Sequence, residues 1–250
     1  MKPILADYVI ARLRRPLPAE YVVRGSTPVL SFGNALDATV ATLGLNPSRR
    51  EFLDRNGRLL SGTARRLETL RSLGVPNLVS VSQSTLRRVI NGCNNYFTVN
   101  PYRWFDQLES ILQSVGASYY DGSACHLDLV QWATDPTWGK IPNRTIRNRL
   151  LKEDAAFLRE QLTTGSFRLL LINGRGVVRP FQRMMGVKRP PAGSVKSRSV
   201  ESRMSLGRLP FGTKVIGWSV NVQSSYGVSN ALRAALACRV RGLNHDDTIV

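Results

Sequence analysis

The chain has 250 residues and is 42% hydrophobic, which predicts a single folded domain and excludes disorder over its whole length. It has 35 lysines and arginines against 17 acidic residues, and the net charge of +18 favours a polyanionic partner, nucleic acid above all. Three scattered cysteines and two histidines form neither a disulfide framework nor a zinc cluster.

The N-terminal segment "MKPILADYVIARLRRPL" is charged too early and too often for a secretory signal. No apolar run approaches the ~20 residues of a membrane span. We therefore expect a cytoplasmic protein with no membrane partner, and we expect it to be a monomer.

Four apolar segments with the composition of buried parallel strands alternate with helical patterns. The predicted strands are residues 38–44, 124–132, 167–172 and 213–220, with a shorter extended segment at 28–33. Helical stripes are predicted at 61–74, at 103–116, from Asn143 or Thr145 onward, and after Val228. The Asn- and Gly-rich residues 91–97 indicate a loop. This order predicts a three-layer α/β/α domain around a four-stranded, mostly parallel sheet.

Residues 182–208 interrupt this pattern, because they are rich in Pro, Gly and Ser. They contain seven lysines and arginines against the single acid Glu201. We expect a basic, flexible loop at about 182–212. Such a loop either contacts a phosphate backbone or is simply solvated and mobile.

Ligands of open parallel sheets bind at the carboxyl ends of the strands. The side chains predicted at those four ends are polar: Asn46, Ser48, Arg49 and Arg50; His126, Asp128 and Gln131; the "NGRG" of 173–176; and Asn221, Gln223, Ser224 and Ser225. They include no nucleophile–base pair, and the acids are too dispersed for a catalytic metal. Nucleotide-binding glycine motifs are absent as well. We expect a site without metal or cofactor that positions water and recognises a polar group.

The segment "VATLGLNPS" (40–48), with the following "NGRLLSGTARRLETLRSLG", resembles the first motif of the uracil-DNA glycosylase superfamily. In that family a strand ends in a Gly-x-Asn-Pro or Gly-x-Asp-Pro turn. "HLDLVQW" (126–132) is similar to the family's middle strand, and "FRLLLINGRGVVRPF" (167–181) resembles its third strand and turn. "QSSYGVSNALRAAL" (223–236) lies where the family has its last loop, but it lacks the usual His and Pro. The resemblance spans residues 28–240, and its first motif is the specific one.

The resemblance implies a monofunctional DNA glycosylase, which flips a nucleotide out of DNA and hydrolyses its N-glycosidic bond. Asn46 would then position the water, and Pro47 would rigidify the turn. Read without the resemblance, Asn46 is a residue that caps the turn, as in many Asn-Pro sequences.

Asp128 departs from the Asn that uracil-cleaving members commonly have at the comparable place. A carboxylate accepts hydrogen bonds from an exocyclic amine such as cytosine N4, and it would repel the O4 of uracil. If Asp128 recognises the base, we expect a modified cytosine as the substrate and defence against modified viral DNA as the role. The alternatives are a structural Asp paired with an arginine or with His126, or an alignment shifted by two residues that makes His126 the reader.

The other candidates have simpler roles. Arg49, Arg175, Lys188 and Arg189 would contact phosphates. The residues expected to line the base or sugar pocket are Gly44, Leu45, Ser48, His126, Gln223 and Ser225, with Phe52, Tyr102 or Tyr226 stacking on the base. Glu51 and Asp54 are interpreted as surface ion-pair residues beside Arg49, Arg50 and Arg55, and the alternative role for them is to assist the water.

Three rival functions remain at this point. A repair enzyme for uracil or mismatches would use the same site. A nucleic-acid-binding protein without catalysis could keep the same fold, and an enzyme of free nucleosides would not need the +18 charge.

Overall fold

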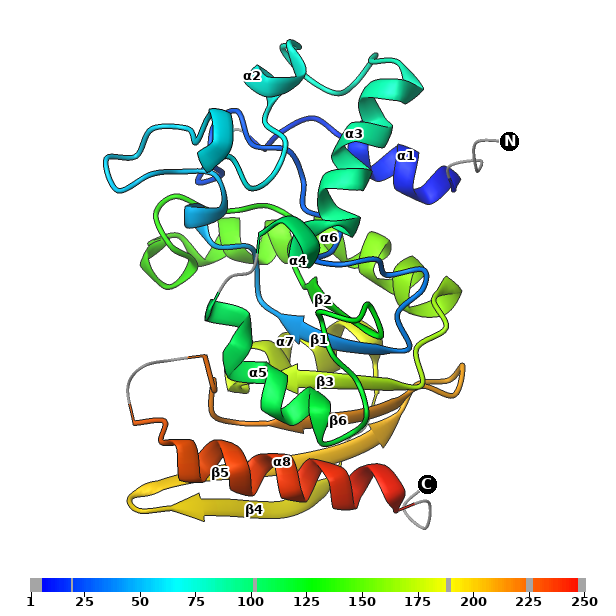
Figure 1. The fold of residues 1–250 in the computed structure, drawn as a ribbon, viewed down its shortest axis with the longest axis vertical. Helices are drawn as coiled ribbons and strands as arrows, with labels where there is room; N and C mark the ends of the chain where they lie inside the picture. The colour runs from blue at the N-terminus through cyan, green and yellow to red at the C-terminus, as the bar shows by residue number, and fades with distance from the viewer. Residues whose placement is uncertain (1–5, 19, 101–102, 188–189, 224–226, 247–250) are drawn as a thin grey trace.

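The computed structural model describes residues 6–18, 20–100, 103–187, 190–223 and 227–246. Within these residues, six strands form one mixed sheet in the order β2-β1-β3-β6-β5-β4 (Figure 1). The strands are β1 (Val40–Gly44), β2 (Ala124–Asp128), β3 (Leu169–Asn173), β4 (Pro191–Ser197), β5 (Val200–Arg208) and β6 (Lys214–Trp218). The predicted α/β class is confirmed, and the predicted number of four strands is wrong.

The strands β2, β1, β3 and β6 pair in parallel and correspond to the four predicted apolar segments. All of their residues are buried except Gly44, which is half-buried. This double-sided burial explains why the segments have no polar face. The second strand ends at Asp128, four residues earlier than predicted, and its carboxyl end therefore lies level with Gly44 of β1.

The hairpin of β4 and β5 extends the sheet in the antiparallel sense. The prediction of a flexible loop at about 182–212 is therefore wrong. In β5, the buried Ser202, Met204 and Leu206 alternate with more exposed residues. This period of two is a strand pattern that the Pro, Gly and Ser content of the whole segment obscured. The first residues of the predicted loop belong to the end of helix α7.

Eight α-helices lie in the described part of the chain: α1 (Asp7–Leu13), α2 (Leu70–Leu73), α3 (Gln83–Asn94), α4 (Tyr96–Val99), α5 (Arg103–Gln113), α6 (Arg144–Thr164), α7 (Arg175–Met185) and α8 (Asn230–His245). The helix predicted at 61–74 is reduced to α2 after a 3-10 turn at 62–64. The predicted loop at 91–97 is helical instead, because Leu86, Val89 and Cys93 form a buried stripe of α3.

Helices cover both faces of the parallel strands, as the three-layer prediction requires (Figure 1). Helices α5 and α8 pack on one face, where Val40 of β1 and Leu171 of β3 belong to the larger core. Helices α6 and α7 pack on the other face, against Ala41 and Leu43. Since side chains alternate along a strand, Gly44 faces the α5 side at the carboxyl end of β1.

A buried ion pair links α1 and α6 to the segment after β2. Arg12 and Asp154 lie 3.1 Å apart, and both are almost fully buried. Asp154 also accepts the backbone N–H of Gln131 at 2.7 Å, and Gln131 donates its side-chain amide to the carbonyl of Asp128 at 2.9 Å. The ion pair thus anchors the segment that follows Asp128.

Among the described residues, no helix is long and apolar enough to cross a membrane.

Candidate functional site

A cavity of about 490 Å³ lies at the carboxyl ends of the four parallel strands. Each of the four strand ends supplies lining residues. From β1 to β6 in chain order they include Asn46, Asp128, Asn173 and Asn221. The volume falls in the range of small-molecule sites. The cavity therefore lies at the edge of the sheet that the sequence predicts for a ligand.

Asn46 lines this cavity, and its side-chain orientation is determined by its neighbours. Its amide nitrogen donates to the carbonyl oxygens of Pro47 at 3.0 Å and Trp132 at 3.3 Å, and to the hydroxyl of Thr134 at 3.1 Å. Carbonyl oxygens only accept hydrogen bonds, so the NH₂ group must face them. The Oδ1 atom at the opposite corner has no hydrogen-bond partner among the described residues. It is available to a ligand or a water.

Gly44 allows two side chains of β2 to lie over the end of β1. A Cβ atom at this position would lie 2.6 Å from Oδ1 of Asp128 and 2.6 Å from Nε2 of His126. Both distances are shorter than any ordinary contact. Glycine is therefore required here by close approach, and its backbone does not adopt a positive φ.

Asp128 is 5% exposed and lines the cavity. Its side chain accepts no hydrogen bond within the described ranges, although Nε2 of His126 lies 3.5 Å from Oδ1. A buried carboxylate that lacks donors is unfavourable unless a ligand supplies them. This carboxylate is the clearest sign of a binding site in the cavity.

His126 is held from its other side. Its Nδ1 lies 2.7 Å from the hydroxyl of Thr42, and that hydroxyl lies 2.6 Å from the hydroxyl of Tyr119. Burial raises the pKa of Tyr119 well above its usual value, so its phenol stays protonated. The chain of hydroxyls orients the imidazole and leaves Nε2 directed toward Asp128.

Asn173 connects the ends of β3 and β6. Its amide donates to Asn221 at 2.9 Å and to Gln223 at 3.0 Å, and its Oδ1 accepts from the indole of Trp218 and the backbone N–H of Val222. Gln223 in turn donates to the carbonyl of Trp104 at 3.2 Å. These residues form one hydrogen-bonded wall of the cavity. Both the oxygen and the nitrogen of the Gln223 amide are hydrogen-bonded within the protein.

The mouth of the cavity is basic and aromatic. Arg49 pairs with Asp135 at 2.6 Å, and the exposed Arg175 begins helix α7. Trp104 and Trp138 also line the cavity and were missed as site residues. The helical period of residues 103–116 predicts Trp104 on the buried face of its helix, but its side chain is 42% exposed, in the first turn of α5.

The remaining predicted site residues divide into three groups. Leu45, Pro47 and Ser48 line the cavity, as do Gly44, His126, Gln223, Arg49 and Arg175. Phe52 is fully buried in the core, so the prediction that it stacks on a base is wrong. Lys188, Arg189 and Ser225, like Tyr102 and Tyr226, lie outside the described residues.

Glu51 is 2% exposed, and its interpretation as a surface ion-pair residue is wrong. It is the last residue of the 3-10 turn Arg49–Glu51 that comes after Asn46, and its side chain is buried. Tyr96 donates its hydroxyl to Glu51 at 2.5 Å, and Nη1 of Arg66 lies 3.7 Å away. Burial raises the pKa of Glu51 to about 7, with Asp128 adding a smaller contribution in the same direction. Asp54, in contrast, is tied to the backbone and side chain of Arg58.

Comparisons with known proteins add no assignment. No protein-family model matches this chain, and no curated protein matches its sequence. The chemistry of the cavity follows from its own residues. Among the described residues it offers an amide oxygen and a buried carboxylate that accept no hydrogen bond, together with an imidazole, two arginines and two tryptophans.

The close contact at Gly44 predicts a specific sensitivity. Gly44→Ala should displace Asp128 or His126 and destabilise the protein by about 1–3 kcal/mol. Gly176, which lines the same cavity, is a matched control because no atom lies within 4 Å of its added Cβ. Gly176→Ala should leave stability equal or higher by up to about 1 kcal/mol. Equal urea unfolding midpoints for the two variants would contradict this account of Gly44.

The raised pKa of Glu51 predicts how stability depends on pH. The folded state holds this proton up to about pH 7, whereas the unfolded chain releases it near 4.5. The contribution of Glu51 to stability is thus present below pH 4.5 and is lost as the pH rises through 7. Glu51→Gln keeps an acceptor for Tyr96 and cannot ionise. From pH 5 to pH 8, the unfolding free energy of Glu51→Gln should therefore rise relative to that of the parent protein by on the order of 3 kcal/mol.

Urea titrations of the two proteins at several pH values measure this shift. Glu160→Gln removes an exposed carboxylate of α6 and serves as the control for the loss of one negative charge. A constant difference for Glu51→Gln would show that Glu51 is ionised throughout this range.

Proposed function

We propose that this protein is a monofunctional DNA glycosylase of the uracil-DNA glycosylase superfamily, built on that family's α/β/α fold. The observation that carries the proposal is the orientation of Asn46. Its NH₂ group is anchored by two carbonyls and Thr134, and its Oδ1 is free at a cavity of about 490 Å³. A glycosylase needs a base-sized cavity, because its target must leave the stack before the bond can be reached.

Hydrolysis of an N-glycosidic bond develops positive charge on the sugar as the base departs. A water therefore needs positioning beneath C1′ more than it needs a strong base. The Oδ1 of Asn46 accepts a hydrogen bond from such a water and directs its lone pair toward the sugar. The proton of the water passes to solvent or to the departing base, and no covalent enzyme intermediate forms.

The lining of the cavity supports hydrolysis over lyase chemistry. A glycosylase that cuts the strand forms a Schiff base with an amine. Among the described residues that line the cavity there are arginines but no lysine. The expected product is an abasic site in an intact strand.

Asp128 supports an amino-bearing base as the substrate. Its carboxylate accepts no hydrogen bond within the described ranges, with Nε2 of His126 3.5 Å away, and the N4 amine of cytosine would supply one. Since removal of ordinary cytosine would destroy the host genome, the pocket must require a substituent, such as a hydroxymethyl or glycosylated group. We therefore propose a modified cytosine as the substrate and defence against modified viral DNA as the role.

The partner that fits this site is DNA. The net charge of +18 attracts the phosphate backbone, and Arg49 and Arg175 at the mouth are placed to contact phosphates beside a flipped nucleotide. We propose further that the protein acts on DNA as a monomer in the cytoplasm. Binding to DNA should weaken steeply with salt, unlike binding of a free nucleoside.

Asn46→Ala should lower the single-turnover rate of base release by about 100-fold or more, because the water loses its acceptor. The assay incubates the protein with oligonucleotides that contain uracil, mismatches or modified cytosines, and then counts alkali-sensitive sites. Asn56→Ala, in the exposed part of the following loop, is the control and should release base at the parent rate. DNA affinity and unfolding midpoints are measured for each variant. Equal rates for both variants would refute the role of Asn46, and a lack of release from the whole panel would favour a non-catalytic binding protein.

Asp128→Asn should change which base is released, since an amide can donate to an O4 atom that a carboxylate repels. We expect the variant to release modified cytosine at least about fivefold more slowly, the lower end of the roughly 1–3 kcal/mol that a good base contact contributes to discrimination. Release of uracil should rise or appear. Competition between the two bases in one duplex measures the change. An unchanged preference would assign Asp128 to structure and leave uracil or mismatch repair as the function.

A further inference from the structure

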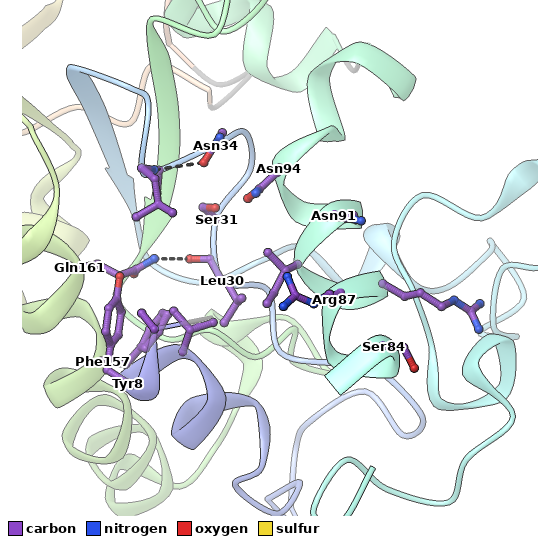
Figure 2. A pocket seen from close by; sticks show the side chains of 16 residues that line it. Tyr8, Leu30, Ser31, Asn34, Ser84, Arg87, Asn91, Asn94, Phe157 and Gln161 are labelled. Carbon is purple, nitrogen blue, oxygen red and sulfur yellow. Dashed lines mark hydrogen bonds between the residues drawn. The ribbon is translucent and has the colours of Figure 1, made fainter. Parts of the chain in front are cut away.

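A second cavity, of about 500 Å³, lies between helices α1, α3 and α6 and the chain segment 30–36 (Figure 2). It shares no lining residue with the candidate site. The proposed glycosylase activity gives it no role. Its walls differ sharply in polarity, and this difference indicates what it can bind.

One wall is apolar and aromatic. Tyr8 of α1 and Phe157 of α6 pack with their ring centroids 5.7 Å apart, and Leu30 lies beside them (Figure 2). Leu36 at the rim is 63% exposed. A ring or a short aliphatic body would bury apolar surface against this wall.

The opposite wall is a polar stripe of α3. Arg87, Asn91 and Asn94 follow one another at helical spacings of four and three residues and line the cavity. The side chains of these three residues have no hydrogen bond or ion pair with other described residues. Figure 2 shows Arg87 reaching from α3 into the space that faces Leu30. The neighbouring Arg88 also lines the cavity, but Glu68 and the carbonyl of Ser72 bind its guanidinium.

A buried amide adds to this polarity. Gln161 is 5% exposed and lines the cavity, and its nitrogen donates to the carbonyl of Leu30 at 2.9 Å. Its Oε1 has no partner in the part of the chain that the structure describes. A half-buried guanidinium without a counter-ion and an amide oxygen without a donor are both unfavourable in an empty site.

We propose that this cavity binds a small organic anion: an aromatic or aliphatic body with one carboxylate, phosphate or sulfonate group. The body packs against Tyr8, Leu30 and Phe157. The anionic group accepts charge-assisted hydrogen bonds from Arg87, and Asn94 donates beside it. A donor group on the same ligand would satisfy Gln161.

The fluorescent sulfonate 1-anilinonaphthalene-8-sulfonate and its uncharged analogue N-phenyl-1-naphthylamine test this directly. The folded protein should bind one sulfonate molecule, with a dissociation constant that Arg87→Gln raises about tenfold, in line with the loss of a charge-assisted hydrogen bond. Arg149→Gln removes a positive charge from the exposed surface of α6, outside the cavity, and should leave the constant within twofold. Ala35→Leu, which narrows the cavity, should weaken both probes. The uncharged probe should respond to Ala35→Leu and not to Arg87→Gln.

Three results would overturn the proposal. Equal effects of Arg87→Gln and Arg149→Gln would mean that general charge attracts the probe. Binding of several probe molecules with no response to Ala35→Leu would mean that the cavity is not the site. Displacement of the sulfonate by an unmodified DNA oligonucleotide would mean that Arg87 belongs to a nucleic-acid surface. Unfolding midpoints of all variants exclude loss of the fold as the cause.

Discussion

The candidate site depends on the backbone segment that follows β2. Trp132 and Thr134 in this segment supply two of the three acceptors that orient the amide of Asn46. The segment is itself anchored by the buried Arg12–Asp154 pair through Gln131. A buried ion pair contributes little net stability, but loss of one partner leaves a charge unpaired. Helices α1 and α6, remote from the cavity along the chain, thus determine which atom of Asn46 a ligand meets.

The site also contains features that a stable fold would avoid. Asp128 is buried and accepts no hydrogen bond from the part of the chain that the structure describes, and Glu51 is buried with a raised pKa. Gly44 leaves no space for a side chain at the end of a core strand. All three lie around the turn that begins at Asn46 or against it. Such local costs are expected where binding or catalysis requires them, and elsewhere the strands follow ordinary burial rules.

The parallel core and the location of the cavity could be predicted because each follows from a single local signal. Strands that are apolar on both faces indicate a covered parallel sheet, and the ends of such strands indicate where Asn46 and Asp128 meet. The β4–β5 hairpin could not be found from composition, because its buried residues alternate with Gly, Ser and Arg. Glu51 and Trp104 were misplaced for a related reason. The charges beside Glu51 and the helical period around Trp104 are properties of a whole segment. The direction of a single side chain depends on its tertiary contacts.

The central claim is that Oδ1 of Asn46 holds a water beneath the sugar of an extruded nucleotide. A crystal structure of the protein with DNA that contains a 2′-fluoro, non-hydrolysable modified cytidine tests it most directly. The account predicts the base against Asp128 and one water about 2.6–3.2 Å from Oδ1, on the face of the sugar opposite the base. A nucleotide bound in the cavity with Oδ1 in contact with the base or a phosphate, and no water beneath the sugar, would contradict it.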